Sequence, residues 1–230
     1  MFAGYAMFLS DLTSPQVLPN EIPIFPLSGA TLLPRCQLPL NLFEPRYVAM
    51  LDDAMKGHRL IGMVQPDGYE IRDIPTTYRV GCLGRVTSFS ETDDRRYLLT
   101  LTGVTRFEIA RELDVDTPYR QVFAHYDAHA HDFVPVDDEE FKGREALISL
   151  LKPYFSARSI DADWRSMQHA QREELINMLS IVCPFRPEEK QALLEANSLD
   201  DREATLTAIL QCLPPRKWVT KASIKGKPNS

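Results

Sequence analysis

Hydrophobic positions alternate with polar ones in short runs up to about residue 130 and recur at helical spacing beyond it. The earlier runs are rich in β-branched and aromatic side chains and are separated by Gly, Pro and Asp, which is typical of β-strands. We predict strands over residues 22–25, 60–65, 79–88, 97–102, 105–112 and 119–126. Polar residues 91–94 lie between the third and fourth of these runs and predict an antiparallel hairpin.

One helical pattern interrupts this strand-rich part, beginning at Pro45 and stopping at Gly57. Proline fits the first turn of a helix, and glycine is common just past its end. The apolar positions between them recur at i, i+3, i+4 and i+7: Tyr47, Met50, Leu51 and Ala54. This spacing predicts an amphipathic helix inserted among the strands.

Beyond an acidic, proline-containing hinge at residues 132–140, the apolar positions follow a period of 3.6 and predict three packed helices. Their apolar stripes are Leu147, Leu150, Leu151 and Tyr154; Leu175, Met178, Leu179 and Val182; and Leu206, Ile209, Leu210 and Leu213. Pro184 and Pro187 precede a fourth, shorter helix over residues 188–195, and two prolines at 214–215 end the last one.

Strands that come first and helices that follow, instead of alternating with them, indicate an α+β fold and argue against a doubly wound parallel sheet. We therefore predict an N-terminal extension over residues 1–19 and a β domain over 20–130. A helical bundle over 131–215 and a basic, solvated tail over 216–230 complete the predicted organisation.

Composition and charge indicate a globular protein and bear on whether it binds nucleic acid. The chain of 230 residues is 44% hydrophobic and 25% charged, as expected of a globular protein. Its net charge is −6, and because the last fifteen residues hold five basic and no acidic side chains, residues 1–215 carry about −11. Nucleic-acid binding draws on Lys and Arg that neutralise phosphates, so the acidic body argues against a nucleic-acid partner.

The N-terminal sequence and the cysteines bear on location. The first basic residue is Arg35, so the apolar start has no positively charged region of a secretory signal. No apolar stretch approaches the ~20 residues of a membrane helix. The four cysteines (Cys36, Cys82, Cys183 and Cys212) lack close pair spacing, and we predict reduced thiols in a cytoplasmic protein with no membrane partner.

The sequence offers little catalytic chemistry. The nearest P-loop spacing, Gly57 to Gly62, is followed by Met63 and Val64 instead of the Lys and hydroxyl that bind phosphate and magnesium. No Gly-x-Ser-x-Gly nucleophile elbow is present. We therefore predict no catalytic residue and no cofactor.

One cluster contains residues of the type that bind metals. In an extended strand, period two would place His125, Asp127, His129 and His131 on one face, and imidazoles with a carboxylate suit zinc. A solvent-facing edge strand shows the same alternation of polar residues, so this segment is favoured as structural, with metal binding as the alternative.

Glu44 and Arg46 flank Pro45 at the start of the predicted helix. The pair is either a substrate clamp or, as we favour, a device that holds the helix start. In the second interpretation the carboxylate meets exposed helix amides and the guanidinium reaches a carbonyl or acid across the fold.

Several motifs together resemble a known family. Ile-Pro-Ile-Phe-Pro-Leu at 22–27 and Leu-Pro-Leu-Asn-Leu-Phe-Glu-Pro-Arg-Tyr at 38–47 resemble the opening of the Lon protease N-terminal domain, in particular its free-standing bacterial versions. Val-Gly-Cys-Leu-Gly-Arg-Val at 80–86 and Leu-Thr-Gly-Val-Thr-Arg-Phe at 101–107 look like its later strands. Residues 193–202 are similar to its C-terminal helical pair, so the matches extend from about residue 20 to 213.

The resemblance implies a PUA-like antiparallel β pseudo-barrel followed by a helical bundle, the part of Lon that recognises unfolded or tagged polypeptide. The chain has neither the Walker lysine of the Lon ATPase module nor its protease nucleophile motif, so no catalytic residue is carried over and we expect a non-enzymatic protein.

The favoured hypothesis is a polypeptide-binding module linked to protein quality control or proteolysis, with a protease or chaperone as a candidate partner. Unfolded or apolar segments need an accessible apolar groove, and the cleft between the β domain and the bundle is a natural place for one. We predict that Phe43, Glu44, Arg46 and Tyr47 form part of its wall. The alternatives are RNA binding through the barrel, a metal-dependent hydrolase that uses the His125 cluster, and a subunit of a protease system.

Overall fold

The computed structural model of the protein describes residues 12–71, 74–92, 96–134, 136 and 141–212. The predicted tail at 216–230, most of the predicted N-terminal extension and parts of the predicted hinge and hairpin turn lie outside these residues. A short 3₁₀ helix, η2 (Pro15–Val17), leads into a six-stranded sheet. Its strands are β1 (Glu21–Pro26), β2 (Gln37–Leu42), β3 (Leu60–Val64), β6 (Val80–Glu91), β7 (Tyr97–Glu112) and β8 (Gln121–His125).

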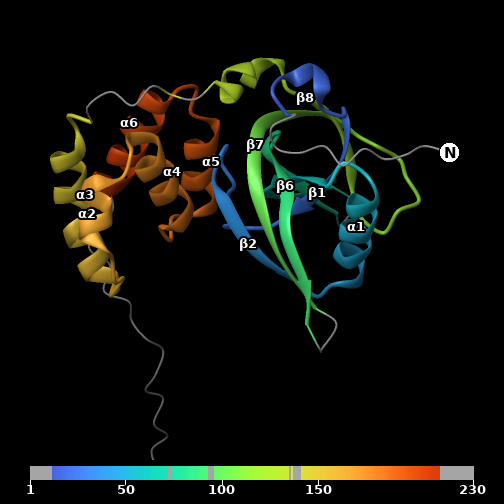
Figure 1. Ribbon diagram of the computed structural model, residues 1–230, viewed down its shortest axis with the longest axis horizontal. Helices are drawn as coiled ribbons and strands as arrows, with labels where there is room; N and C mark the ends of the chain where they lie inside the picture. Colours follow the sequence, from blue (N-terminus) through green and yellow to red (C-terminus); the bar gives the residue numbers. More distant parts are fainter. Residues whose placement is uncertain (1–11, 72–73, 93–95, 135, 137–140, 213–230) are drawn as a thin grey trace, which may run out of the picture.

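The order of the sheet is β2-β7-β6-β3-β1-β8, and an additional pairing between β7 and β8 closes it into a barrel. β2 lies outside the closed ring because it pairs along the first part of β7. Figure 1 shows the barrel on the right and the helical bundle, yellow to red, beside it. The predicted strands are confirmed, except that residues 97–102 and 105–112 form the single strand β7.

The sheet departs from the antiparallel prediction at one place. β1 and β3 run parallel, with Ile24 opposite Gly62, whereas the other strand pairs of the barrel are antiparallel. A long connection containing β2 and a helix joins these two strands, and parallel neighbours need such a crossover.

The pattern of the sequence does not predict β2, because Pro39 interrupts its alternation. Proline cannot donate a hydrogen bond to a neighbouring strand, so it is tolerated where a strand lies at an edge. β2 is such a strand, since it pairs with β7 alone.

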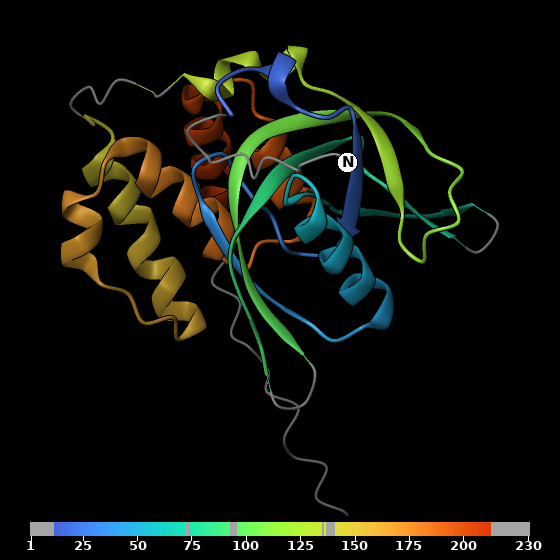
Figure 2. The same cartoon turned by 45° about the vertical axis from the view of Figure 1, so that its right-hand side comes forward.

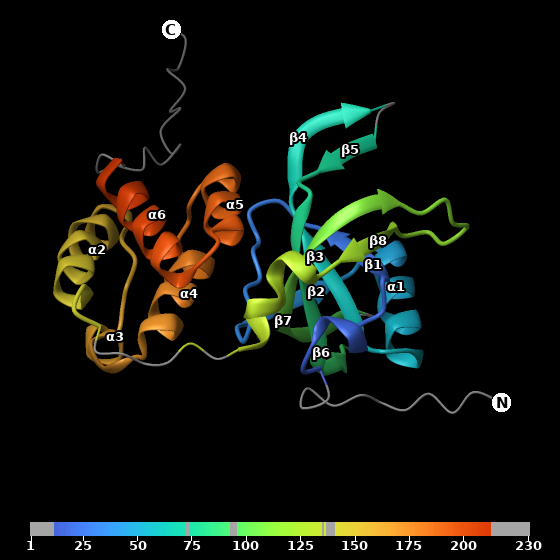
Figure 3. The ribbon, with the colours of Figure 1, turned by 90° about the horizontal axis from the view of Figure 1, so that it is seen from above.

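A second pair of strands also went unpredicted. β4 (Pro66–Ile71) and β5 (Ile74–Thr77) form a separate two-stranded antiparallel hairpin. Figure 3 shows this hairpin projecting from the barrel, away from the main sheet. It carries three exposed apolar side chains, Tyr69, Ile71 and Ile74.

The predicted inserted helix is confirmed as α1 (Pro45–Lys56). Its apolar stripe is buried as predicted and belongs to a core cluster shared with the barrel, where the rings of Tyr47 and Phe25 meet edge to face with centroids 4.4 Å apart. Figure 2 shows α1 lying against the barrel between the β6–β7 pair and β1. The helix thereby fills one side of the barrel core.

The remaining helices follow the barrel: η3 (Asp127–Phe133), a 3₁₀ helix, then α2 (Arg144–Arg158), α3 (Trp164–His169), α4 (Arg172–Val182), α5 (Pro187–Glu195) and α6 (Leu199–Cys212). The predicted domain boundary at 130/131 lies inside η3. The three predicted helical stripes fall on α2, α4 and α6, and their buried members form one core cluster. Val182 is the exception, because 60% of its surface is exposed; Leu213 lies outside the described residues.

Gly103 lies in the middle of β7, where the loop before β2 crosses the strand. Its N–H donates to the Cys36 carbonyl and its own carbonyl accepts from the Arg35 N–H, both at 2.8 Å. A Cβ here would overlap the carbonyl oxygen of Leu33. Glycine is therefore required for the close approach of these two backbone segments.

We expect Gly103→Ala to lower the free energy of unfolding by about 1–3 kcal/mol, the usual cost of overpacking a well-packed site. Urea denaturation measures this loss. Gly143→Ala is the control, because the atoms nearest to a methyl group there belong to side chains, those of Glu203 and Phe141, and not to the backbone. An equal loss in both variants would contradict the assigned role of Gly103.

Candidate functional site

A hollow of about 420 Å³ lies between the barrel and the bundle. We call it the junction groove. The barrel side is the loop before β2, and the bundle side is one face of α4. Its lining residues are Pro34, Arg35, Cys36, Gln37, Gln171, Glu173, Glu174, Asn177, Met178, Ile181 and Val182.

One wall of the junction groove is apolar. Met178, Ile181 and Val182 stand at i, i+3 and i+4 on α4 and therefore share a face of that helix. Met178 and Ile181 are half-buried, whereas Val182 is largely exposed. The predicted packing of Val182 in the bundle core is thus wrong, because its side of α4 faces the groove.

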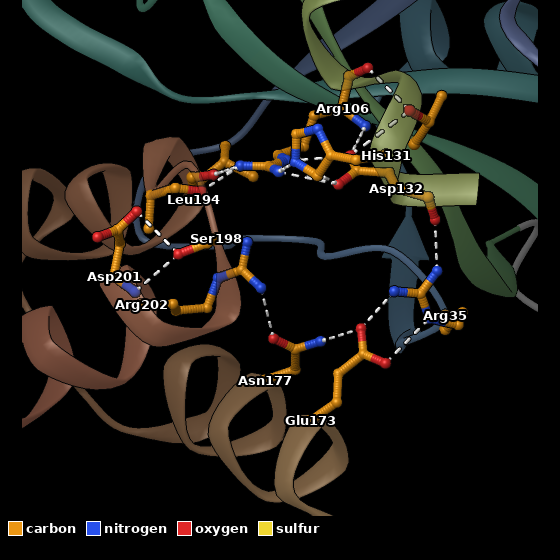
Figure 4. Close-up of polar contacts among 12 residues, drawn as sticks. Arg35, Arg106, His131, Asp132, Glu173, Asn177, Leu194, Ser198, Asp201 and Arg202 are labelled. Carbon is orange, nitrogen blue, oxygen red and sulfur yellow. Dashed lines mark hydrogen bonds and ion pairs between the residues drawn. The ribbon is translucent and has the colours of Figure 1, made fainter. Parts of the chain in front are cut away.

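The other end of the groove is polar. The guanidinium of Arg35 forms an ion pair with Glu173 and donates to the carbonyl of Asp132, so it joins the barrel loop to both η3 and α4. Asn177 donates to Glu173 at 3.5 Å and accepts from Arg202 at 2.9 Å. Figure 4 shows this chain of contacts running from Arg35 to Arg202.

Arg106 of β7 anchors the junction from the barrel side (Figure 4). Its side chain is 1% exposed and forms an ion pair of 2.8 Å with Asp132, which is 6% exposed. Its Nη1 donates to the carbonyls of Leu194 (3.0 Å) and Ala196 at the end of α5. Its Nη2 lies 2.8 Å from Nε2 of His131, which accepts because arginine only donates. One buried side chain thereby links β7, η3 and α5.

Two glutamines add a second link between the barrel and α5. Gln65 donates to the side chain of Gln191 at 3.1 Å and to the carbonyl of Pro187 at 3.2 Å. Gln191 in turn donates to the carbonyl of Val80 at 3.0 Å. Both glutamines are buried and hydrogen-bonded, so they hold α5 against the barrel in addition to Arg106.

Two ionisable groups of the junction, Asp132 and Cys36, have shifted pKa values. Burial alone would raise the pKa of Asp132, but hydrogen bonds from Arg106 and the charge of that residue outweigh it and hold the pKa below its ordinary value. Burial, with the nearby charge of Glu173 adding to it, raises the pKa of Cys36 to about 11. A thiol with this pKa is protonated at neutral pH and is a poor nucleophile.

We expect Asp132→Asn to lower the free energy of unfolding at pH 7 by about 3–5 kcal/mol, because it leaves a buried guanidinium without its counter-charge. The pKa of Asp132 is lowered in the folded protein, so its contribution is complete above the unfolded value of about 4 and is lost as the pH falls through the folded value. The stability difference between wild type and variant should therefore shrink below about pH 4. Urea titrations across this range test it, and a difference independent of pH would contradict the assignment.

The predicted wall residues lie elsewhere. None of Phe43, Glu44, Arg46 and Tyr47 is among the residues that line the junction groove. Arg46 and Tyr47 instead border a second hollow of about 450 Å³, built from barrel residues, the β4–β5 hairpin and the start of α1, and we call it the α1 hollow. Phe43 is largely exposed. In Figures 1 and 3, α1 lies on the side of the barrel away from the bundle.

Glu44 and Arg46 pair with each other at 2.8 Å. The Glu44 carboxylate makes no capping hydrogen bond to α1. The expected contact between this carboxylate and the helix amides is therefore wrong, and the guanidinium of Arg46 instead lies over the ring of Tyr47, 4.5 Å from its centroid.

The extended strand that the metal-binding alternative requires does not form, because β8 ends at His125 and the chain turns into η3 at Asp127. The four side chains consequently do not alternate on one strand face. His129 is buried, and burial with the charge of Arg106 lowers its pKa. Within the described part of the chain, no three His, Cys, Asp or Glu side chains gather as a metal site.

Sequence reasoning missed the residues that shape the junction. Asp132 was assigned to an acidic hinge, and Arg106 to an ordinary strand. The available signal was the position of Arg106, between the apolar residues Val104 and Phe107 in a run that predicts a strand. A charge in such a run calls for a buried partner.

Comparison with known proteins identifies the family. A family model described as the ATP-dependent protease La (LON) substrate-binding domain matches residues 21–211. Lon protease of Anaeromyxobacter dehalogenans is 28% identical over 225 residues, which cover 93% of this chain and 25% of the relative. Lon protease 2 of Myxococcus xanthus is 26% identical over 226 residues, covering 96% and 26%. The chain thus spans about a quarter of the length of these curated relatives.

Solved structures show the same fold. The crystal structure of a Lon N-terminal domain protein from Xanthomonas campestris has a TM-score of 0.58 at 21% identity and covers 82% of this chain and 97% of that one. The N-terminal domain of the Mycobacterium avium complex Lon protease has a TM-score of 0.57 at 13% identity, with coverage of 84% and 98%. The protein is therefore an α+β domain of the Lon N-terminal type, which confirms the predicted fold class.

Because the family model covers most of the chain, the protein belongs to the LON substrate-binding domain family. This confirms the resemblance noted from the sequence motifs. Among the described residues, no helix is both long and apolar enough to span a bilayer.

Proposed function

We propose that the protein is a non-catalytic module that binds extended, apolar segments of other polypeptides in the junction groove. The observation that carries this proposal is the apolar wall of Met178, Ile181 and Val182, with Val182 left open to solvent at the edge of a 420 Å³ hollow. Exposed apolar surface in a concave site is typical of protein recognition.

The rigidity of the groove supports the same function. Its two walls belong to different parts of the fold, and the contacts of Arg35 and Arg106 hold those parts in fixed register. A preformed groove binds without the cost of ordering its own walls. A flexible, apolar segment is then the partner that gains order.

Family membership supports a link to proteolysis, since the family is described as a substrate-binding domain and the relatives are Lon proteases. We infer that this chain recognises polypeptides and leaves turnover to a partner, a protease or a chaperone. The four cysteines are free thiols, which supports a cytoplasmic setting. The turn at residues 43–47 remains a predicted contact for polypeptide.

Val182→Asp tests the proposal, because it places a charge on the apolar wall at a position exposed enough to leave folding intact. We expect the Kd for fluorescently labelled, unfolded casein to rise about tenfold or more, since burying a valine side chain contributes about 1.5–3 kcal/mol. Fluorescence anisotropy measures the change.

Val17→Asp is the matched control, because Val17 is an exposed valine outside the groove. Its Kd should equal that of the wild type. Equal binding by wild type and Val182→Asp, or no binding of casein by the wild type, would refute the proposed site.

A further inference from the structure

We propose that the α1 hollow and the adjoining β4–β5 hairpin form a second docking surface, which selects apolar polypeptide segments flanked by Lys or Arg. The inference rests on the proposed polypeptide binding and adds a sequence preference to it. It follows from the placement of apolar and charged side chains around the hollow.

The apolar part of this surface is the hairpin. Ile71 of β4 is paired with Ile74 of β5, so these two side chains share one face of the hairpin, and Tyr69 lies two residues before Ile71 on β4. All are exposed, Tyr69 to 75%. Ile74 also lines the α1 hollow, so the apolar face of the hairpin continues the wall of the hollow.

The loop from β7 to β8 lines the same hollow. This loop adds Val115, another exposed apolar side chain that lines the hollow. Apolar groups from the hairpin and from this loop therefore line a hollow of about 450 Å³. An extended segment with two or three apolar side chains matches this arrangement, because alternate residues of a strand point to opposite sides.

The cations that border the hollow are already neutralised. Arg46 is paired with Glu44, and Arg120 is paired with Glu112 and donates to the carbonyl of Pro75 at 3.0 Å. Burial lowers the pKa of Arg120, as expected for a guanidinium held against the protein. These arginines therefore add no net positive charge to the surface.

The acids of the same loop have no such partners. Asp114 lines the hollow and Asp116 lies two residues further on, and both are exposed. Neither forms an ion pair with any residue in the described ranges. The surface thus combines exposed apolar groups with uncompensated negative charge, and a basic flank on the bound segment complements it.

Three fluorescent peptides test the preference, each with the same core of valine, tyrosine and isoleucine, and with flanks of lysine, glutamate or serine. We expect the lysine peptide to bind the full chain at least tenfold more tightly than the glutamate peptide at low ionic strength. Salt should reduce the difference, because exposed charges are screened.

Variants assign the preference to this surface. The double variant Asp114→Asn, Asp116→Asn should reduce the lysine-to-glutamate ratio by threefold or more. The control Glu145→Gln, Glu188→Gln removes the same charge from exposed positions on the bundle and should leave the ratio unchanged. Ile74→Ser should weaken all three peptides alike, whereas Val17→Ser should weaken none.

The outcomes separate this inference from the proposed function. Equal binding of the lysine and glutamate peptides, or an unchanged ratio in the Asp114, Asp116 variant, overturns the inference even where Val182→Asp still weakens casein binding. If Val182→Asp abolishes the preference for the lysine peptide, the preference belongs to the junction groove, and the inference is overturned as well. Dimerisation that depends on concentration and is abolished by Ile74→Ser would show that a second copy of the chain occupies this surface. That result would overturn the inference as well. If neither casein nor any peptide binds, both proposals fail.

Discussion

The buried guanidinium of Arg106 holds the fold together at the point where barrel and bundle meet. Removing such a charge from water costs several kcal/mol, and the structure offsets that cost with the carboxylate of Asp132 and two carbonyls at the end of α5. These acceptors come from different elements. The charge can therefore be satisfied only when η3 and α5 are both docked on β7.

The junction groove depends on this docking. Its barrel wall is the loop that approaches β7 at Gly103, and its bundle wall is α4, which Arg35 ties to the same loop through Glu173. The groove is thus a product of tertiary packing, since its two walls come from different parts of the fold. The polar contacts of Arg35 and Arg106 set the position of the two walls. The apolar character of the groove comes from Met178, Ile181 and Val182.

The sequence was sufficient for elements whose pattern is local. The apolar spacing of α1, α2, α4 and α6, and the β-branched runs of β1, β3 and β6, predicted those elements, whereas the short helix α3 was not predicted. β2 was missed because Pro39 obscures a strand that is tolerated at the edge. The candidate site was less accessible, because the partners in each contact lie far apart in sequence. Asp132 reads locally as part of an acidic hinge, and only the fold reveals Arg106 beside it. The shared strand face considered for the histidine cluster is absent for a related reason. Alternation of polar residues cannot reveal where a strand ends and a 3₁₀ helix starts.

Leu194 sits on α5, yet its side chain belongs to the core cluster of the barrel and α1, not to the core of the bundle. The bundle thereby contributes a buried side chain to the barrel core. A fragment cut between the two regions would open that interior to water on one side and strip a helix of its apolar contact on the other. Strands and helices that are segregated along the chain are for this reason expected to unfold together, as one cooperative unit.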